Sequence, residues 1–410
     1  MNRSNVKDAS RNSIGLVEAI SGQSVKPDIV HLTAAYSFDH HRIYGKESCS
    51  ALKAGLRVAV VGMEPQVAVS SSVTGFAPNV TVLKRHRSRL RFGTMWHLFK
   101  HAMRLRGRII HAHEPQSLMV GVLVKFLTRC RLVYDAHEDY ARTYAYNHVA
   151  GKYARSALRK AVACIEWFLC LFVDWVCVVD EHIGRRFARW HKRVSVVHNF
   201  PPLDFGVQQL SRRIRPKNAV YIGLLDRQIA LPEMIESTAE VVKTHPDFEL
   251  WLLGSGDDQF IQTYLAKTEA LGISGNVKYF GRVPHAEIPK WLSAAGIGLI
   301  LYGGQDNYQD ESFFTVKMIE YMAYGLPLIT SAFRGLRQTL IPIGCSVFVD
   351  PTQPQEIARQ ISGLLENPTL ADAMGQAGYA AFRGRFNWDE GEAPKLLALY
   401  SFLLHEELGC

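Results

Sequence analysis

Two stretches of this 410-residue sequence place ionisable side chains at the end of an apolar run of strand length. The run IIHAH ends in His113 and is followed by Glu114, and the run LVYDA is followed by His137 and Glu138. Buried parallel strands bring their carboxyl ends to one edge of a sheet, where ligands bind in doubly wound folds. At that edge a histidine can hydrogen-bond a hydroxyl group, and the carboxylates can contact a ligand or begin a helix. The sequence therefore predicts a polar site built from strand ends.

Two pairs of charged residues have helical spacing. Arg42 and Lys46 lie in DHHRIYGKE, and Lys317 and Glu320 lie in TVKMIEYMAYGLPLITS, so each pair would share one face of a helix. Lys317 and the backbone N–H groups at the start of its helix can bind phosphate. Arg42 and Lys46 either meet a phosphate group or form a solvated face, and their types alone leave both interpretations open.

Apolar runs of strand length alternate with helix-length segments along both halves of the chain. In the first half the runs are 29–33, 58–62, 80–83, 109–113, 132–136, 176–180 and 194–199; in the second they are 219–223, 249–254, 277–281, 297–302, 327–331 and 346–350. Buried parallel strands joined by crossover helices account for this pattern. The predicted fold class is α/β, with two doubly wound, Rossmann-like domains whose parallel sheets face a central cleft.

Breaks in this pattern predict the domains. The polar and basic residues 1–26 form a predicted flexible tail, and the N-terminal domain covers 27–205. Two prolines at 201–202 and the charged stretch SRRIRPKN after them indicate a linker. The C-terminal domain covers 216–385, and residues 386–410 form a terminal helix that is expected to cross back to the N-terminal domain.

The net charge of +9 is unevenly distributed along the chain. Residues 1–205 hold 30 Lys and Arg against 15 Asp and Glu, whereas the remainder holds 17 against 23. A basic half indicates an anionic partner, either a membrane surface, a lipid-linked phosphate or a nucleic acid. Segment 83–108 alone holds nine Lys or Arg beside an apolar stripe of helical spacing. This stripe either packs on the N-terminal sheet or lies on an anionic membrane.

The sequence favours a protein that stays in the cytoplasm. Its start, MNRSNVKDASRNSIG, lacks the apolar core of a signal peptide. The apolar stretch 161–179 is long enough to span a membrane, but it contains Glu166 and Asp174, so a buried helix running into a buried strand is expected. Seven scattered cysteines without a CxxC pair suit a reducing compartment and predict neither disulfides nor zinc.

Six segments, taken in order, carry a resemblance to a known family. They are YSFDHHRIYGKESCSALKAGLRVAVV, IIHAHEPQSLMVGVL, LVYDAHEDY, LWLLGSGDD, NVKYFGRVPHAEIPKWLSAAGIGLILY and KMIEYMAYGLPLITS. Together they resemble the family 4 retaining glycosyltransferases of the GT-B fold, over residues 28 to about 400. The resemblance implies transfer of a sugar, with retention of its anomeric configuration, from a nucleotide diphosphate-sugar in the C-terminal domain to an acceptor in the N-terminal domain.

The resemblance also implies roles for single residues. It places the active-site histidine on His113 and gives Glu320 the two ribose hydroxyls of the donor. The implied donor-binding residues are Arg227, Gly254, Gly256, Arg282, Val283, Lys317 and Glu320. The acceptor-binding residues that we expect are Arg42, Lys46, Glu114, His137 and Glu138. Catalysis would stabilise an oxocarbenium-like state with help from the leaving phosphate, because no carboxylate is placed as a nucleophile.

The sequence departs from the family pattern in the C-terminal half. In the family, two positions of the diphosphate site are commonly basic, and here they are Leu224 and Ile229. Either Arg227 and Lys317 bind the diphosphate instead, or the site is weakened. Many members carry a glutamate eight residues before Glu320, where this chain has Ser312 with Glu311 beside it. An inactive sugar-nucleotide-binding partner subunit is therefore one alternative function.

The expected acceptor is lipid-linked, because the N-terminal half is basic. This favours a peripheral protein on the inner face of the membrane, in the synthesis of exopolysaccharide, capsule or lipopolysaccharide. No metal cluster is visible, so no cofactor is expected and transfer would be metal-independent. A nucleotide-sugar 2-epimerase is a further alternative, whereas nucleic-acid binding is disfavoured because no recognition motif is present.

Overall fold

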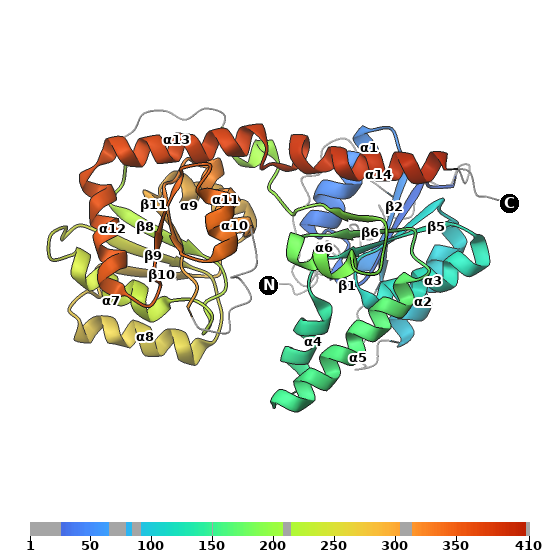
Figure 1. The fold of residues 1–410 in the computed structure, drawn as a ribbon, viewed down its shortest axis with the longest axis horizontal. Coiled ribbons are helices and arrows are strands. Elements are labelled where there is room, and N and C mark those ends of the chain that lie inside the picture. Colours follow the sequence, from blue (N-terminus) through green and yellow to red (C-terminus); the bar gives the residue numbers. More distant parts are fainter. Residues whose placement is uncertain are drawn as a thin grey trace, which may run out of the picture. The chain divides into compact units, whose positions relative to one another are not determined.

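The structure is a computed structural model of the chain and describes residues 26–64, 79–83, 92–149, 151–207, 215–303 and 314–406. The chain forms two compact units (Figure 1). Unit 1 comprises Met1–Val179, Ile183–Val197 and Ala393–Cys410, and unit 2 comprises Asp180–His182 and His198–Glu392. The predicted tail up to residue 25, the linker residues 208–214, and Glu311 and Ser312 lie outside the described residues.

The described part of unit 1 contains a seven-stranded sheet whose paired strands are all parallel. Its strands, in the spatial order β3-β2-β1-β4-β5-β6-β7, are β1 (Ile29–Ser37), β2 (Val58–Met63), β3 (Asn79–Leu83), β4 (Ile109–Ala112), β5 (Arg131–Ala136), β6 (Trp175–Val178) and β7 (Val194–Val196). β2 and β4 are buried along their whole length. Both faces of the sheet are therefore covered, which explains why these strands read as continuous apolar runs.

Helices cover this sheet and connect its strands (Figure 1). They are the π-helix η1 (His41–Ser48), α1 (Cys49–Lys53), α2 (Phe92–Leu105), α3 (Pro115–Thr128), α4 (Tyr140–His148), α5 (Lys152–Cys170), α6 (Glu181–Phe187) and α14 (Ala393–His405). α14 packs against η1, α1 and β4, although unit 2 precedes it in the chain. The last segment of the chain thus completes the core of unit 1.

The described part of unit 2 repeats the architecture with a six-stranded parallel sheet. Its strands, in the order β10-β9-β8-β11-β12-β13, are β8 (Asn218–Ile222), β9 (Glu249–Leu253), β10 (Val277–Gly281), β11 (Ile297–Ile300), β12 (Leu328–Ser331) and β13 (Ser346–Val349). Its helices are η2 (Leu203–Phe205), α7 (Leu231–Val241), α8 (Asp258–Ala270), η3 (His285–Glu287), α9 (Ile288–Ser293), α10 (Val316–Ala323), α11 (Arg334–Leu340), α12 (Pro354–Glu366), α13 (Pro368–Gly384) and η5 (Trp388–Glu392). Each predicted apolar run forms a strand, and the predicted α/β fold with two parallel sheets is confirmed.

The predicted helix and strand within 161–179 are both present, as the end of α5 and as β6. The expectation that this helix is buried is wrong. Ile165, Phe168 and Leu171 are each about half exposed, while Glu166 is fully buried. The reason is that Glu166 accepts hydrogen bonds from Tyr134 and Arg186, which turns this one carboxylate inward and leaves neighbouring apolar side chains outside.

The stripe predicted within 83–108 forms part of α2, although residues 84–91 lie outside the described residues. Leu98 and Ala102 are fully buried. The stripe therefore packs on the sheet, which was one of the two predicted alternatives. Trp96 remains exposed, with the ammonium of Lys100 5.3 Å from its ring centroid. In the part of the chain that the structure describes, no helix has the length and apolarity of a membrane span.

Candidate functional site

A cluster of buried histidines occupies the carboxyl edge of the unit 1 sheet. His31 on β1 and His111 on β4 are register partners in the parallel ladder, so their side chains point to the same face. His113 follows β4 directly, and all three rings are fully buried. The ring centroids lie 4.6–5.1 Å apart in stacked or tilted pairs. Two strand ends therefore bring three imidazoles into contact.

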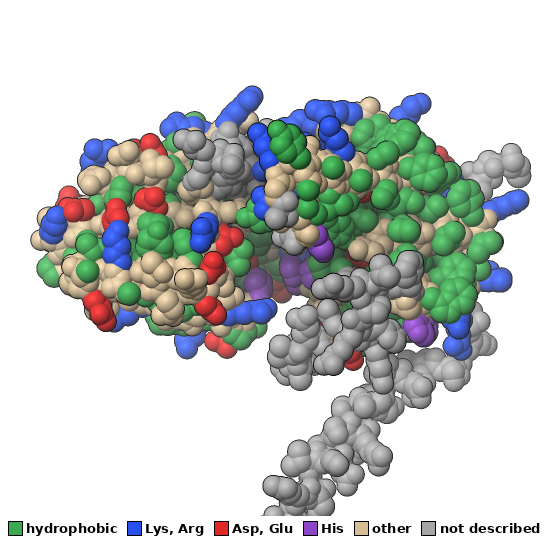
Figure 2. Space-filling view, turned by 90° about the horizontal axis from the view of Figure 1, so that it is seen from below, with side chains coloured by type: hydrophobic (Ala, Val, Ile, Leu, Met, Phe, Trp, Pro, Cys, Tyr) green, Lys and Arg blue, Asp and Glu red, His purple; other side chains and the backbone are tan. Residues whose placement is uncertain are grey.

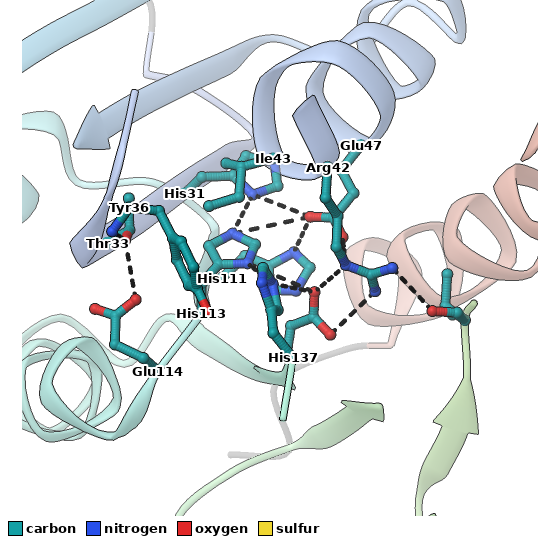
Figure 3. A network of polar contacts seen from close by, with 12 residues as sticks. His31, Thr33, Tyr36, Arg42, Ile43, Glu47, His111, His113, Glu114 and His137 are labelled. Atoms are coloured by element: carbon teal, nitrogen blue, oxygen red, sulfur yellow. Dashed lines mark hydrogen bonds and ion pairs between the residues drawn. The ribbon is translucent and has the colours of Figure 1, made fainter. Parts of the chain in front are cut away.

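Hydrogen bonds join this cluster into a chain (Figure 3). His113 Nε2 lies 2.9 Å from His31 Nδ1, and His113 Nδ1 lies 3.1 Å from His137 Nε2. His137 Nε2 in turn lies 3.0 Å from a carboxylate oxygen of Asp135. Burial lowers the pKa of His31, His111 and His113 well below the usual histidine value. These rings are therefore neutral, and each has one donor and one acceptor nitrogen. His113 uses both in the chain, whereas His31 uses only Nδ1.

Arg42 anchors the other end of the chain from inside the π-helix η1. Its guanidinium donates to both oxygens of Asp135, at 2.9 and 3.1 Å, and to the carbonyl of Val197 at 2.9 Å. Burial raises the pKa of the Asp135 carboxyl, but Arg42 and the neighbouring histidines outweigh that effect and hold the pKa well below its usual range. The interpretation of Arg42 and Lys46 as a solvated face is wrong, because they are only 1% and 7% exposed. Their contact with an acceptor phosphate stays a prediction.

Glu47 faces the same guanidinium but has a different environment. Its Oε1 lies 2.9 Å from Arg42 Nε, while Oε2 lies 3.7–4.0 Å from nitrogens of three histidines. Burial raises the pKa of Glu47 well above its usual value, and the charge of Arg42 offsets this only in part. Of the two carboxyl groups beside Arg42, Asp135 therefore carries the negative charge.

Two sets of side chains have the spacing of metal ligands. The ligand atoms of His31, Glu47, His111 and His113 lie within 4.8 Å of one another, and so do those of His113, Asp135 and His137. A divalent ion in the first set would require Glu47 to ionise beside Arg42. The inward nitrogens are already hydrogen-bonded: His31 pairs with His113, and His111 Nδ1 lies 2.6 Å from the hydroxyl of Tyr400. Nε2 of His31, Nε2 of His111 and both oxygens of Glu47 are buried without a hydrogen-bond partner among the described residues.

Glu114 acts inside the fold as a helix cap. It is the N-cap of α3, in a capping box with Ser117. Its carboxylate also accepts from the backbone N–H of Ala34 at 2.5 Å and from the hydroxyl of Thr33 at 2.9 Å. Burial raises the pKa of Glu114 to about 7. Acceptor contact by Glu114 stays a prediction. Helix capping, one of the two roles predicted for the acidic residues after β5, is confirmed at Asp139, the N-cap of α4, whose side chain accepts from the N–H of Arg142.

A partly exposed layer covers the histidine cluster. Tyr36 stacks on His137 with ring centroids 4.9 Å apart and makes a tilted contact with His40 at 4.5 Å. Its hydroxyl lies 3.1 Å from that of Tyr140. Glu138 is exposed beside these rings in sequence. Aromatic faces next to a carboxylate and an imidazole suit a hydroxyl-rich ligand, because rings can stack on its apolar face while the polar groups bind its hydroxyls.

A second site lies in unit 2, where the loops after β8 and β9 run side by side. The N–H of Gly223 donates to the carbonyl of Leu253, and Leu225 pairs with Gly256. A Cβ on Gly254 would lie 1.7 Å from the Gly223 carbonyl oxygen, and one on Gly256 would lie 1.9 Å from that of Leu225. Both glycines are therefore needed for loop contact, a role that differs from the close approach to a ligand expected of them.

Lys317 on α10 reaches under the first of these loops. Its Nζ donates to the hydroxyl of Tyr221 at 2.9 Å and lies 4.1 and 5.2 Å from the ring centroids of Tyr221 and Tyr302. A Cβ on Gly223 would lie 2.7 Å from the same Nζ. Burial lowers the pKa of Lys317 to about 7, although Glu320 and Asp226 act in the opposite direction. The ammonium is thus held against a glycine backbone, and no carboxylate of the described residues is bonded to it.

Glu320 lies one turn further along α10 and is 5% exposed. Its Oε1 accepts a hydrogen bond from Nε2 of His285 at 2.8 Å. His285, in η3 after β10, is well exposed and stacks on Phe205 with the ring centroids 5.6 Å apart. The structure therefore brings Glu320 and Lys317 to the same helix, as their spacing predicted, and adds His285 as a direct partner of the carboxylate.

The remaining predicted donor residues surround this site to different degrees. Arg227 and Arg282 are exposed, and Val283 is half-buried against the core of unit 2. Leu224 is 59% exposed, whereas Ile229 is buried and forms a bridge with Tyr302. The two positions that are commonly basic in the resembled family thus differ, one open to solvent and one part of the core. The binding roles of Arg227, Arg282 and Val283 stay predictions.

Sequence reasoning missed several members of both sites. His31, Glu47, His111 and Tyr400 complete the unit 1 cluster, and Tyr221 and His285 complete the unit 2 site. A signal was available for His31 and His111, since each is the third residue of an otherwise apolar strand. No local pattern connects Tyr400 to His111, because they are 289 positions apart.

Comparison with known proteins finds family matches in both halves of the chain. Residues 207–381 match the family described as Glycosyl transferases group 1, and residues 48–205 match Glycosyltransferase Family 4. The D-inositol 3-phosphate glycosyltransferase of Segniliparus rotundus is 32% identical over 312 residues, covering 72% of this chain and 66% of that protein. A GDP-mannose-dependent monoacylated alpha-(1-6)-phosphatidylinositol monomannoside mannosyltransferase of Corynebacterium glutamicum is 26% identical over 38% of this chain and 40% of its own. The chain thus matches less than two thirds of the length of these relatives.

Solved structures share the fold. Sucrose-phosphate synthase from Thermosynechococcus elongatus superposes with a TM-score of 0.68 at 20% identity, covering 93% of this chain and 99% of its own. HepE from Anabaena, in complex with UDP, gives 0.66 at 15% identity and covers 91% and 100%. Because consecutive parts of the chain match the two family descriptions and the two parallel sheets match these structures, the chain belongs to the family 4 glycosyltransferases of the GT-B fold.

Proposed function

We propose that the protein transfers a hexose or related sugar from a nucleotide diphosphate-sugar to a lipid-linked acceptor, with retention of anomeric configuration, in the synthesis of a cell-surface polysaccharide or glycolipid. The observation that carries this proposal is the position of Lys317. Its ammonium lies under the Gly223 backbone and one helical turn from the buried carboxylate of Glu320. A cation and a carboxylate at this spacing match the diphosphate and the ribose of one nucleotide.

The diphosphate is the leaving group of the reaction, so negative charge builds on it as the glycosidic bond breaks. Lys317 can neutralise that charge, and the N terminus of α10 adds the partial positive charge of a helix dipole. Arg227, exposed on the loop after β8, supplies the second cation. These groups stabilise the departing phosphate without a metal, and we propose metal-independent transfer for that reason.

A nucleotide-sugar donor is supported by what similar proteins bind. HepE from Anabaena has been solved with UDP and with UDP-glucose, and two relatives are described as GDP-mannose-dependent. These names disagree about the base. The main chain at Arg282 and Val283 is where we propose that the base binds, because this loop follows β10 at the same sheet edge as Gly254.

The acceptor site that we propose lies on the partly exposed layer of unit 1, formed by Tyr36, His40, His137 and Glu138. The buried chain from His31 to Arg42 keeps His113 and His137 in fixed orientations beneath it. Relatives described as D-inositol 3-phosphate glycosyltransferases and as phosphatidylinositol monomannoside mannosyltransferases act on phosphate-bearing acceptors. Together with the basic N-terminal half, this supports a lipid-linked phosphate as the acceptor and transfer at the inner face of a membrane.

A thermal-shift titration with UDP, GDP, ADP and TDP tests the donor site, because a ligand that binds only the folded state raises its stability. We expect one nucleotide to raise the melting temperature of unit 2 and Glu320→Ala to abolish the shift. Glu287→Ala is the matched control, since Glu287 is exposed on η3. A protein that responds to none of the four nucleotides would contradict the proposal and would mean that the replacements at Leu224 and Ile229 abolish nucleotide binding.

A further inference from the structure

A separate basic cavity lies at the amino-terminal edge of the unit 1 sheet. Its volume is about 610 Å³, within the range of small-molecule sites. The cations that line it are Lys26, Arg106, Arg108, Arg129 and Arg131. Arg108 directly precedes β4 and Arg131 begins β5, whereas His113 and His137 follow the other ends of these strands. The cavity and the histidine cluster therefore lie on opposite edges of one sheet.

Two of these arginines have a structural task. Arg108 donates to the carbonyl of Leu404 at 2.8 Å and Arg131 to that of Glu406 at 3.0 Å, so both satisfy the last turn of α14. Glu406 is the acidic residue of the lining, and its carboxylate is held by Arg193 at 2.7 and 3.0 Å. The acid nearest the cavity is thus already neutralised.

The other two arginines of the lining are Arg106 and Arg129. Among the described residues, Arg106 and Arg129 have neither an ion-pair nor a hydrogen-bond partner for their side chains. Both have left-handed backbones, with φ of 49° and 57°, at the ends of α2 and α3. Gathering like charges around a cavity destabilises a fold unless an anion offsets their repulsion. The lining therefore has the charge of an anion-binding site.

An exposed apolar surface begins at the same cavity. Leu127, which lines it, and Phe126 beside it on α3 are both 63% exposed. Phe126 contacts Phe172 with ring centroids 5.0 Å apart, and Phe172 contacts the exposed Phe168 of α5 at 5.6 Å. Hydrophobic side chains gather on the surface of unit 1 in Figure 2, with Lys and Arg at their margin. The apolar surface is continuous from the basic cavity to α5.

We propose that this basic cavity binds the phosphate headgroups of anionic phospholipids, while the apolar side chains of α3 and α5 enter the adjoining acyl region. A phosphate joined to hydrocarbon is the chemistry that matches cations beside exposed Leu and Phe. A nucleic acid would leave the apolar surface without a partner, and free phosphate would leave it in water. This lipid-binding surface is separate from the acceptor site. Its role in the cell rests on the proposed function.

The test is sedimentation of the full chain with vesicles of phosphatidylcholine alone or mixed with phosphatidylglycerol. We expect binding to the mixed vesicles and a loss of roughly twentyfold in the double variant Arg106→Asn, Arg129→Asn, since each cation near a charged surface contributes severalfold. Asparagine tolerates the left-handed backbone at both positions. The matched control is Lys53→Asn, Arg189→Asn, which removes the same charge from exposed positions outside the cavity.

A second variant, Phe126→Ser, Leu127→Ser, tests the apolar surface and should weaken binding to the same vesicles with all charges kept. The proposal is overturned if the arginine variant binds as tightly as the wild type, or if the control loses as much. It is also overturned if inorganic phosphate or duplex DNA binds while the mixed vesicles do not. Nucleotide-induced thermal shifts, measured on the same variants, should stay unchanged, so failure of lipid binding and failure of the donor site are distinguishable.

Discussion

Nε2 of His285 lies 2.8 Å from Oε1 of Glu320, so the carboxylate that we propose for the donor ribose is already hydrogen-bonded within the protein. A donor that uses both oxygens of Glu320 must displace this histidine, whose side chain is 63% exposed. His285→Ala should therefore tighten nucleotide binding by roughly two- to fivefold, the range for an exposed ion pair. Calorimetric titration measures it. Weaker binding in this variant would mean that His285 contacts the nucleotide itself.

The affinity for a nucleotide-sugar should depend on pH through Lys317. With a pKa of about 7 in the free protein, this amine is charged below neutrality and neutral above it, whereas a bound diphosphate favours the charged form. Affinity should thus fall roughly tenfold from pH 6 to pH 8, because above the pKa binding must take up one proton, whose availability falls tenfold per unit of pH. Intact nucleotide-sugars suit the measurement, since their phosphates do not titrate in this range.

Lys317→Gln should bind more weakly and lose this pH dependence. Lys290→Gln, which removes an exposed charge from α9, should retain it. An unchanged pH profile in Lys317→Gln would show that another group titrates with the donor.

Gly254→Ala should disrupt the paired loops of unit 2. The added Cβ would meet the Gly223 carbonyl at 1.7 Å from a backbone with φ of 149°, so the loops must separate. We expect a loss of roughly 2–4 kcal/mol in the stability of unit 2 and loss of nucleotide binding. Gly275→Ala is the matched control, because a Cβ there meets nothing within 4 Å. Equal stability of the two variants would contradict the close contact.

The buried histidines should make unit 1 sensitive to acid. His31, His111 and His113 have depressed pKa values, so the unfolded chain binds protons near pH 6.5 that the folded chain does not. Stability is therefore complete above about pH 6.5 and falls below it, by roughly 1.4 kcal/mol per histidine between pH 7.5 and 5.5. In His111→Phe this fall should be smaller by that amount, measured by hydrogen exchange of the β4 amides. An identical fall would mean that His111 is protonated in the folded state.

The fold was predictable because its signals are local. Each apolar run became a strand, and the spacing of Lys317 and Glu320 identified a helix that carries both residues. The contacts of Arg42 were not predictable, since its partners Asp135 and Val197 lie 93 and 155 positions away. The same spacing argument left Arg42 and Lys46 open between a phosphate contact and a solvated face, because periodicity gives a shared face and does not say whether that face meets solvent or the core.

The prediction that α5 ends as a buried helix failed for a different reason. Its apolar composition indicated a core helix, but Arg186 and Tyr134 bind Glu166 on the inward side. A buried carboxylate with two partners thus set the rotation of the helix, and apolar side chains such as Phe168 and Leu171 were left outside. Composition over a window does not report which side of a helix a paired charge occupies.

The most direct test of the central claim is product analysis of the purified protein with a panel of nucleotide-sugars and a polyprenyl-diphosphate-linked acceptor, with and without a chelator. We expect one productive donor, release of one nucleoside diphosphate per glycosylated acceptor, and retained anomeric configuration. Turnover should be equal with and without the chelator. An altered sugar recovered from the donor alone would point to a 2-epimerase. Binding of a nucleotide-sugar without transfer to any acceptor would contradict the claim and make the protein a sugar-nucleotide-binding partner subunit.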